Sequence, residues 1–175
     1  MSQKSDRDRG DSGTHPERTP AESFMALCRA CDEFTWYEYV ATSVGDERLR
    51  QFDDQDWAEL KALLPSAPVP VLERIVCCLR DGANPHHAEI LQDLILSGSD
   101  DVMAVAIRPL VTCDFDFPEE TVTRIVEGIL RLSPEANTLD RMTFMDVLSR
   151  LRPKLSEDLL RRIDGQLPGL REAGA

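Results

Sequence analysis

From residue 68 onward, apolar side chains recur three and four positions apart in short blocks, and most blocks end at a glycine or a proline. Positions with this spacing share one face of an α-helix, so each block predicts an amphipathic helix. The stops are too frequent for one long helix and predict several short helices joined by short turns. These helices are expected to begin near residues 70, 85, 100, 118, 138 and 156.

Three further helices are expected before this region. The tetrapeptide 19–22 combines an N-cap threonine, a proline at the first helical position and a glutamate that can close a capping box. A similar pattern begins at Thr35 and predicts a short helix that Gly45 ends. A third helix is predicted over about 54–64, where Pro65 ends it.

Two of the later helices carry unusual patterns. The segment 100–112 is apolar on nearly every side, which indicates contact with neighbours in several directions. Pro109 lies inside it and should kink or end the helix, because proline lacks the N–H that a helix interior needs. In the segment 138–151, the inward face is predicted to consist of Leu139, Met142, Met145, Leu148 and Leu151.

Strand patterns are weak throughout the chain. No stretch alternates cleanly over six residues between turn residues, so the predicted fold class is all-α. Residues 1–18 hold no aliphatic side chain beyond Met1 and are expected to form a disordered polar tail before one all-helical domain over 19–175. The chain has neither an apolar run of eighteen residues nor an apolar leader, so we expect no membrane helix, no secretory signal and a cytoplasmic protein.

The succession of helices resembles a known architecture. When alternate helices are taken, the first of each pair begins near residues 70, 101 and 139. Short turns favour antiparallel neighbours, and three such pairs resemble an α-solenoid of the HEAT or armadillo class over roughly residues 68–168. The resemblance is one of helix-pair pattern, and it implies a short right-handed stack of helices. A compact helical bundle is the alternative.

The chain is strongly acidic. It carries 32 acidic and 20 basic side chains, for a net charge of −12. The excess lies in residues 1–120, which hold 24 acidic and 11 basic side chains, whereas residues 121–175 hold 8 and 9. Such a surface repels phosphate backbones and anionic lipids, so direct nucleic-acid and membrane binding are disfavoured and a basic partner protein is favoured.

The same charge suggests where a partner would bind. Acidic residues cluster over 46–59, and those at 100–101 and 114–120 would extend this surface if they fall on the same side. Aromatic residues in the cluster 34–39 and at 57 would supply interface anchors, or the cluster could instead seal the N-terminal end of the core. The predicted partner-binding residues are Trp36, Tyr37, Asp46, Glu47, Asp53, Asp54, Asp56, Trp57, Glu59, Asp100 and Asp101.

The cysteines and histidines allow a metal-binding alternative. Five cysteines at uneven spacing argue against a disulfide framework. Cys28 and Cys31 form a C-x-x-C pair on an apolar helical face, and a zinc site would need Cys77 and His86 to join them. Buried cysteines and a helix-start histidine account for the same residues without a metal, so neither a metal nor a cofactor is predicted.

The sequence shows no motif of an enzyme. It has no Gly-x-Ser-x-Gly nucleophile elbow and no glycine-rich phosphate loop, and 32 acidic residues produce carboxylate pairs by chance. We therefore predict a non-catalytic protein-interaction module, such as an adaptor, an inhibitor or an immunity-type protein, which binds a basic partner through an acidic helical face. The alternatives are a structural subunit of a larger assembly and a zinc-binding protein.

Overall fold

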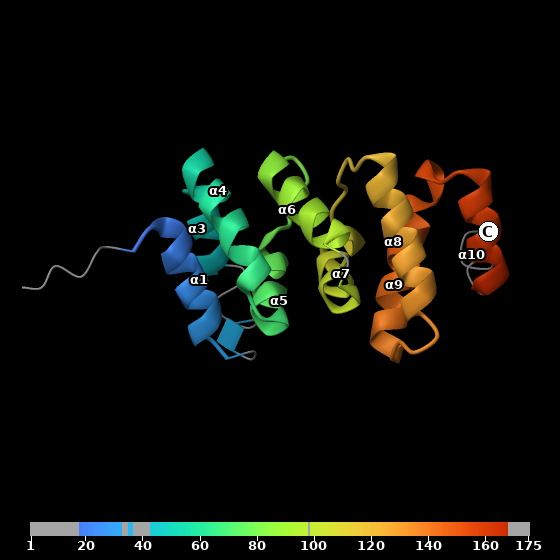
Figure 1. The fold of residues 1–175 in the computed structure, drawn as a ribbon, viewed down its shortest axis with the longest axis horizontal. Coiled ribbons are helices and arrows are strands. Elements are labelled where there is room, and N and C mark those ends of the chain that lie inside the picture. The colour runs from blue at the N-terminus through green and yellow to red at the C-terminus, as the bar shows by residue number, and fades with distance from the viewer. Residues whose placement is uncertain (1–17, 33–34, 37–42, 98, 168–175) are drawn as a thin grey trace, which may run out of the picture.

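The computed structural model describes residues 18–32, 35–36, 43–97 and 99–167, and every regular element in these ranges is helical (Figure 1). The predicted all-α class is confirmed. No helix in these ranges is long and apolar enough to cross a lipid bilayer. The α-helices are α1 (Pro20–Ala30), α3 (Asp46–Arg50), α4 (Asp54–Leu63), α5 (Val69–Cys78), α6 (Pro85–Leu96), α7 (Asp100–Ala106), α8 (Glu119–Leu132), α9 (Thr138–Leu151) and α10 (Glu157–Gln166). Short 3-10 turns are η2 (Leu64–Ser66), η3 (Arg108–Val111) and η4 (Arg152–Lys154).

Several helix starts form as the sequence predicts. The Thr19 hydroxyl accepts a hydrogen bond from the backbone N–H of Glu22 at 3.1 Å, and the Glu22 carboxylate accepts one from the Thr19 N–H at 3.2 Å. This reciprocal pair is the capping box of α1. The side chains of Asn84 and Ser156 cap α6 and α10. The predicted starts of these three helices are confirmed.

Pro109 interrupts the apolar segment that begins at residue 100. Helix α7 stops at Ala106, and the chain continues as η3, which contains the proline in its first turn. This is the expected result where a ring replaces a backbone N–H. Helix α7 packs against α5, α6 and α8, in agreement with its all-round apolar sequence.

Gly45 does not end a helix. Residues 43–45 are already helical, and α3 begins at the next residue. The backbone angles of Gly45 are φ −65° and ψ −54°, which is ordinary right-handed helix and not the left-handed conformation in which glycine ends helices. The predicted stop is therefore wrong. Residues 37–42, which hold most of that predicted helix, lie outside the described residues.

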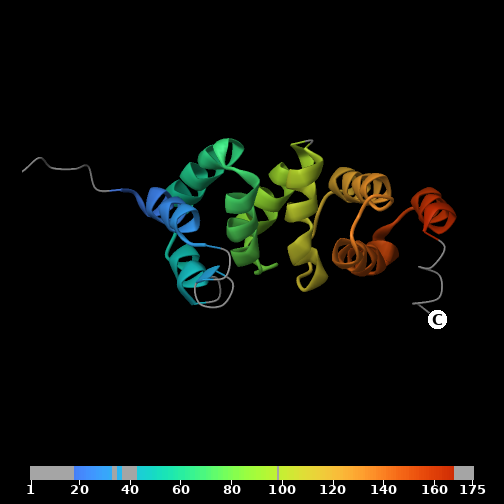
Figure 2. The same ribbon diagram turned by 90° about the horizontal axis from the view of Figure 1, so that it is seen from below.

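The helices follow one another along the long axis of the molecule, from α1 at one end to α10 at the other (Figures 1 and 2). Helices α4, α6, α8 and α10 run in the same direction (Figure 1). Two contacts fix this direction for α4 and α6, since Asp54 lies 3.2 Å from His86 near the two helix starts and Lys61 lies 3.3 Å from Asp93 two turns later. Helix α6 packs against α8, and α8 packs against α10.

A second set of segments consists of α5, α7 with η3, and α9. Helix α5 packs against α7 and η3, and η3 packs against α9. Helix α9 runs opposite to α8 and packs against it (Figure 1). Because α7 also contacts α6 and α8, the two sets share one interior.

Turns that connect successive helices touch one another at one edge of the molecule. At Gly82, a Cβ atom would lie 2.1 Å from the carbonyl oxygen of Asp114, so the turns approach too closely for any side chain there. We call the turns 79–84, 112–118 and 152–156 the turn edge. The contacts that join them are Gly82 with Asp114, the Cys113 thiol with the Arg80 carbonyl oxygen at 2.7 Å, and the Lys154 ammonium with the Phe115 carbonyl oxygen at 3.5 Å.

The buried apolar side chains form one cluster that extends from α1 to α10. Its centre includes Ile75, Ile90 and Ile125, which have no exposed surface. At Gly128 of α8, a Cβ atom would lie 2.1 Å from the thioether of Met103 in α7. Because Gly128 has no side chain, the Met103 side chain fills the space beside its Cα, and α7 and α8 pack closely there.

The inward face of α9 differs from the prediction. Leu139 and Met142 are 72% and 60% exposed. The five residues of the predicted face are spaced three apart. Three residues rotate by about 300° on a helix with 3.6 residues per turn, so each step moves about 60° around the helix axis. Four steps rotate by about 240°, so the five predicted residues cannot share a face. The buried side chains of α9 are Phe144, Val147, Leu148 and Leu151.

Candidate protein-binding surface

The start of α4 holds three of the predicted acidic residues. Asp53 is the N-cap, and its carboxylate accepts hydrogen bonds from the backbone N–H groups of Gln55 and Asp56, both at 2.9 Å. Asp56 accepts one from the Asp53 N–H at 3.2 Å and so closes a capping box. Asp54 lies 3.2 Å from His86 Nε2, yet its side chain is 99% exposed. The helix start is therefore both a structural cap and a patch of negative charge.

Three other predicted acidic residues are engaged within the molecule. Asp46 is half-buried, and burial raises the pKa of its carboxyl group. Glu59 is half-buried and accepts a 2.9 Å hydrogen bond from the Thr19 hydroxyl. Glu47 is exposed but lies 3.6 Å from Arg50 in the same helix. Glu59 thereby joins α4 to the start of α1, and Glu47 pairs within α3.

Asp100 and Asp101 lie apart from the acidic segment 114–120. Asp100 forms a two-pronged ion pair with Arg131 in the last turn of α8. A hydrogen bond from the Arg131 guanidinium holds the pKa of Asp100 below its usual value. The segment 114–120, in contrast, leads into the first turn of α8, and a helix of 14 residues is about 21 Å long. The two segments therefore lie toward opposite ends of α8 and do not form one patch.

Exposed carboxylates lie along the turn edge and at the adjoining start of α4. Asp54 contacts His86 directly after the turn 79–84, and that turn touches Asp114 through Gly82. Asp114 and Asp116 pair with Arg150 and Lys154 at 3.3 and 3.8 Å, but their side chains remain 90% and 104% exposed. Asp81 in the middle turn is also exposed. We call Asp53, Asp54, Asp81, Asp114 and Asp116 the acidic strip.

Neither of the predicted tryptophan anchors is at the surface. Trp36 has no exposed surface, and Trp57 is 3% exposed. The Trp57 ring packs edge-on against Phe52 and stacks on His86, both with ring centroids 5.2 Å apart. Their burial corrects the prediction that these rings contact a partner, and it agrees with the alternative in which large rings seal one end of the core. Tyr37 lies outside the described residues.

The cysteines of α1 and α5 lie near one another. Burial raises the pKa of the Cys28 thiol to about 12, and the neighbouring Cys31 and Cys77 thiols act in the same direction. The Arg74 side chain of α5 donates a 2.7 Å hydrogen bond to the Cys28 carbonyl oxygen. His86 lies elsewhere, between Asp54 and the Trp57 ring. Within the described ranges, no group of three or more His, Cys, Asp or Glu side chains could hold a metal ion, so the zinc alternative gains no support.

His87 is a buried histidine at the first turn of α6. Its Nδ1 accepts a 3.2 Å hydrogen bond from the backbone N–H of Asp81, which leaves the proton of the neutral ring on Nε2. That Nε2 has no hydrogen-bond partner among the described residues. Burial lowers the pKa of the ring. His87, Asp46 and Asp81 line a cavity of about 270 Å³.

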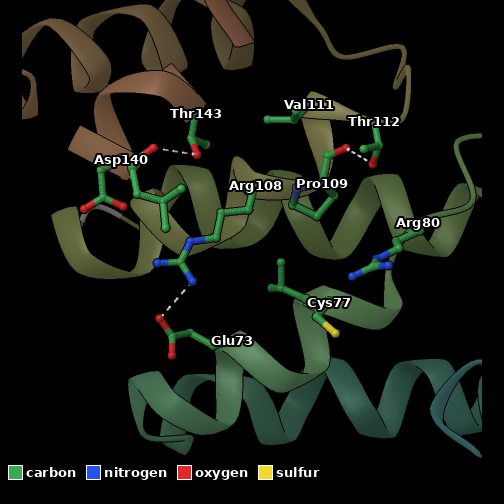
Figure 3. A pocket seen from close by; sticks show the side chains of 11 residues that line it. Glu73, Cys77, Arg80, Arg108, Pro109, Val111, Thr112, Asp140 and Thr143 are labelled. Atoms are coloured by element: carbon green, nitrogen blue, oxygen red, sulfur yellow. Dashed lines mark hydrogen bonds and ion pairs between the residues drawn. The ribbon is translucent and has the colours of Figure 1, made fainter. Parts of the chain in front are cut away.

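A larger pocket of about 610 Å³ opens between α5, η3 and α9 (Figure 3). Arg108 of η3 reaches across it to Glu73 of α5, with a distance of 3.1 Å between the charged groups. No sequence pattern predicts this pocket, because its walls come from three separate segments. The available sign was the spacing of four residues on one face at the end of α5, Glu73, Val76, Cys77 and Arg80. The residues on the other side are Leu139, Asp140 and Thr143 of α9.

Comparisons with protein-family models, with curated proteins and with solved structures found no match to this chain. The inference of function therefore depends on the surface and pockets described above.

Proposed function

We propose that this protein is a non-catalytic protein-binding module, built as a short right-handed HEAT-like α-solenoid, which binds a basic partner through the acidic strip. The helix contacts support a solenoid over a compact bundle. Helix α1 packs against α4 and α5, and α10 packs against α8, so contacts join near neighbours along the chain. A row of elements that each touch the next is the defining property of repeat stacks.

The acidic strip is the observation that carries the proposed binding function. Its carboxylates come from three connecting segments, and those of Asp54, Asp114 and Asp116 are almost fully exposed. Ion pairs at such exposure contribute little to stability, so Asp114 and Asp116 can exchange Arg150 and Lys154 for basic groups of another protein. Exposed carboxylates gathered along one edge of an acidic protein accelerate encounter with a basic protein and select against acidic ones.

The test compares two variants with the same change in net charge. The strip variant carries Asp54→Asn, Asp114→Asn and Asp116→Asn, and the control variant carries Asp93→Asn, Asp101→Asn and Glu135→Gln at exposed positions away from the strip. Each is immobilised and used to capture proteins from native lysate at low and high salt. We expect the unmodified chain and the control to retain the same basic partner at low salt, and the strip variant to lose it.

High salt should release this partner from the unmodified chain and from the control, because screening weakens interactions between exposed charges. Equal capture by the strip variant, or capture that is insensitive to salt, would reject the acidic strip as the binding surface. Far-ultraviolet circular dichroism of each variant establishes that the fold is retained.

A second candidate function is that of a structural subunit in a larger assembly. The observation in its favour is the pair Leu139 and Met142, whose apolar side chains are 72% and 60% exposed on adjacent turns of α9. Large exposed apolar side chains that lie together mark contact surfaces more often than isolated ones do. Light scattering of the purified chain decides between the candidates, because the adaptor is expected to be monomeric and the subunit is expected to self-associate until Leu139→Ser removes the contact.

A further inference from the structure

Cys77 lies in the wall of the 610 Å³ pocket, on the face of α5 that also carries Glu73 and Val76 (Figure 3). Two guanidinium groups line the same pocket, those of Arg80 and Arg108. Arg108 is held by Glu73, and the Asp140 carboxylate also lines the pocket. Arg80 is exposed and forms no salt bridge with any residue that the structure describes, so it supplies the positive charge that a bound anion would meet. The pocket therefore combines a half-buried thiol with positive charge that is open to solvent.

A buried donor next to Cys77 favours its ionised form. The Trp36 ring is fully buried, and its indole N–H favours the charged form of the Cys77 thiol. The pKa of the Cys77 thiol is lowered to about 7, chiefly by the adjacent Cys78 thiol, with the Trp36 N–H and the Arg80 guanidinium acting in the same direction. Burial and the Asp46 carboxylate oppose this shift of the pKa.

The other cysteines lack this combination of access and positive charge. Cys28 and Cys78 are buried, and burial contributes to raising the pKa of both thiols. The Cys113 thiol donates a 2.7 Å hydrogen bond to the Arg80 carbonyl oxygen. Cys31 is half-buried like Cys77, but it does not line the pocket. Accessibility alone would thus give Cys31 and Cys77 similar reactivity, and the pocket distinguishes them.

We propose that Cys77 is a modification site for small disulfides that carry carboxylate groups, which Arg80 and Arg108 attract into the pocket. The Cys77 thiolate attacks one sulfur of the disulfide, a new S–S bond to Cys77 forms, and the original S–S bond breaks. The departing half leaves as a thiolate and takes a proton from water. The half that stays bound places its carboxylate near the arginines, and its apolar part beside Val76, Pro109 and Leu139.

Two small disulfides of opposite charge test this proposal. The first is dithiobis(nitrobenzoate), which carries two carboxylates, and the second is cystamine, which carries two ammonium groups. The full-length chain is treated with each reagent at pH 7 and low salt, and the modified cysteine is located by peptide mass spectrometry after short times. We expect Cys77 to be modified first by the anionic reagent, with an apparent midpoint of its pH profile near 7.

Arginine variants show whether Cys77 reacts because the arginines attract the reagent or only because its thiol is accessible. Arg108→Gln should slow modification by the anionic reagent on the order of threefold to tenfold, as expected for loss of one nearby charge, without slowing cystamine. Arg80→Gln should slow the anionic reagent more than cystamine, because Arg80 both attracts the anion and lowers the pKa of the Cys77 thiol. Arg161→Gln on exposed α10 makes the same change in net charge and should leave both rates unchanged. Modification of Cys31 or Cys113 before Cys77 would overturn the proposal. An equal effect of the three arginine substitutions would overturn it as well.

Discussion

At the scale of single residues, His87 shows how burial fixes the protonation of one side chain. The ring is 6% exposed, its Nδ1 accepts the Asp81 N–H, and Trp57 packs against it with ring centroids 5.3 Å apart. A charged imidazole here would lose hydration and could no longer accept that hydrogen bond at Nδ1. The fold therefore favours the neutral ring, and protonation favours the unfolded chain.

This preference predicts a pH dependence of stability. Because the folded pKa of His87 lies below its unfolded value of about 6.5, the unfolded state binds more protons as the pH falls through 6.5. The free energy of unfolding should thus be fully retained above that pH and decrease below it, with a slope of at most about 1.4 kcal/mol per pH unit from this residue. Urea unfolding between pH 7.5 and 5.5 measures the slope.

His87→Asn and His86→Gln are the matched variants for this measurement. Asparagine keeps an acceptor near the position of Nδ1 but does not titrate, so the slope below pH 6.5 should become smaller in His87→Asn. The His86→Gln variant keeps the His87 ring and its hydrogen bond from the Asp81 N–H, so the contribution of His87 to the slope should remain. A slope that disappears in His86→Gln, or persists in His87→Asn, would contradict the role of His87. The shift of the Asp46 pKa is common to all three proteins and cancels in the comparison.

At the scale of elements, α9 provides a direct test of its observed face. Leu148 is 1% exposed, whereas Leu139 is 72% exposed in the first turn of the same helix. Leu148→Ala should lower the free energy of unfolding by about 2–5 kcal/mol, because it leaves a cavity, and Leu139→Ala should change it by less than about 0.5 kcal/mol. The difference in urea midpoints checks this, and similar losses from both substitutions would support the face predicted from the sequence.

Two glycines should respond to alanine with opposite signs. At Gly82 the new Cβ would meet a backbone carbonyl oxygen at 2.1 Å, so the turn edge must shift and stability should fall by about 1–3 kcal/mol. At Gly165 in α10 nothing lies within 4 Å of the new Cβ, and the better helix propensity of alanine should raise stability by about 0.5–1 kcal/mol. Thermal unfolding of both variants decides the matter, and a stable Gly82→Ala would show that the turns do not touch.

The sequence predicts those features of the elements that depend on local chemistry. Thr19, Asn84 and Ser156 cap helices because their side chains bond to backbone groups two or three residues away, and Pro109 interrupts α7 because of its own ring. Gly45 was misread because glycine permits a helix end without requiring one.

Features that depend on packing between distant segments could not be predicted from the sequence. The burial of Trp57 depends on Phe52 and on the two histidines of α6, and no spacing within α4 reports them. The acidic cluster at 53–56 is visible in the sequence, but the position of Asp114 relative to it depends on the close contact at Gly82. Which side chains line the pocket of Figure 3 depends on how α9 packs against η3.

At the scale of the whole molecule, stability should vary along the row of helices. Helices α6, α7 and α8 have neighbours on both sides, whereas α10 packs mainly on α8. In a stack with nearest-neighbour contacts, an end element opens at a lower cost in free energy than the centre. Amide hydrogen exchange should therefore show the lowest protection in α10, and the highest in α6 and α8.

The variants Ile163→Ala in α10 and Ile125→Ala in α8 extend this prediction. Both side chains are buried, so each substitution leaves a comparable cavity. We expect Ile163→Ala to lower protection in α10 alone, and Ile125→Ala to lower it in all central helices. If Ile163→Ala lowers protection equally in α1 and α5, the molecule unfolds as one cooperative unit, and the compact bundle is the better description.

The contact of Met103 with Gly128 has a consequence for alignment along the helix axes. A shift of α7 by one turn in either direction would bring its methionine against position 124 or 132, and these are an arginine and a leucine. Both residues have side chains that fill the space which the Met103 thioether would need. The packing of α7 on α8 therefore allows a single axial register. The two helices can change their crossing angle or separate, but a shift by one turn along their axes is excluded.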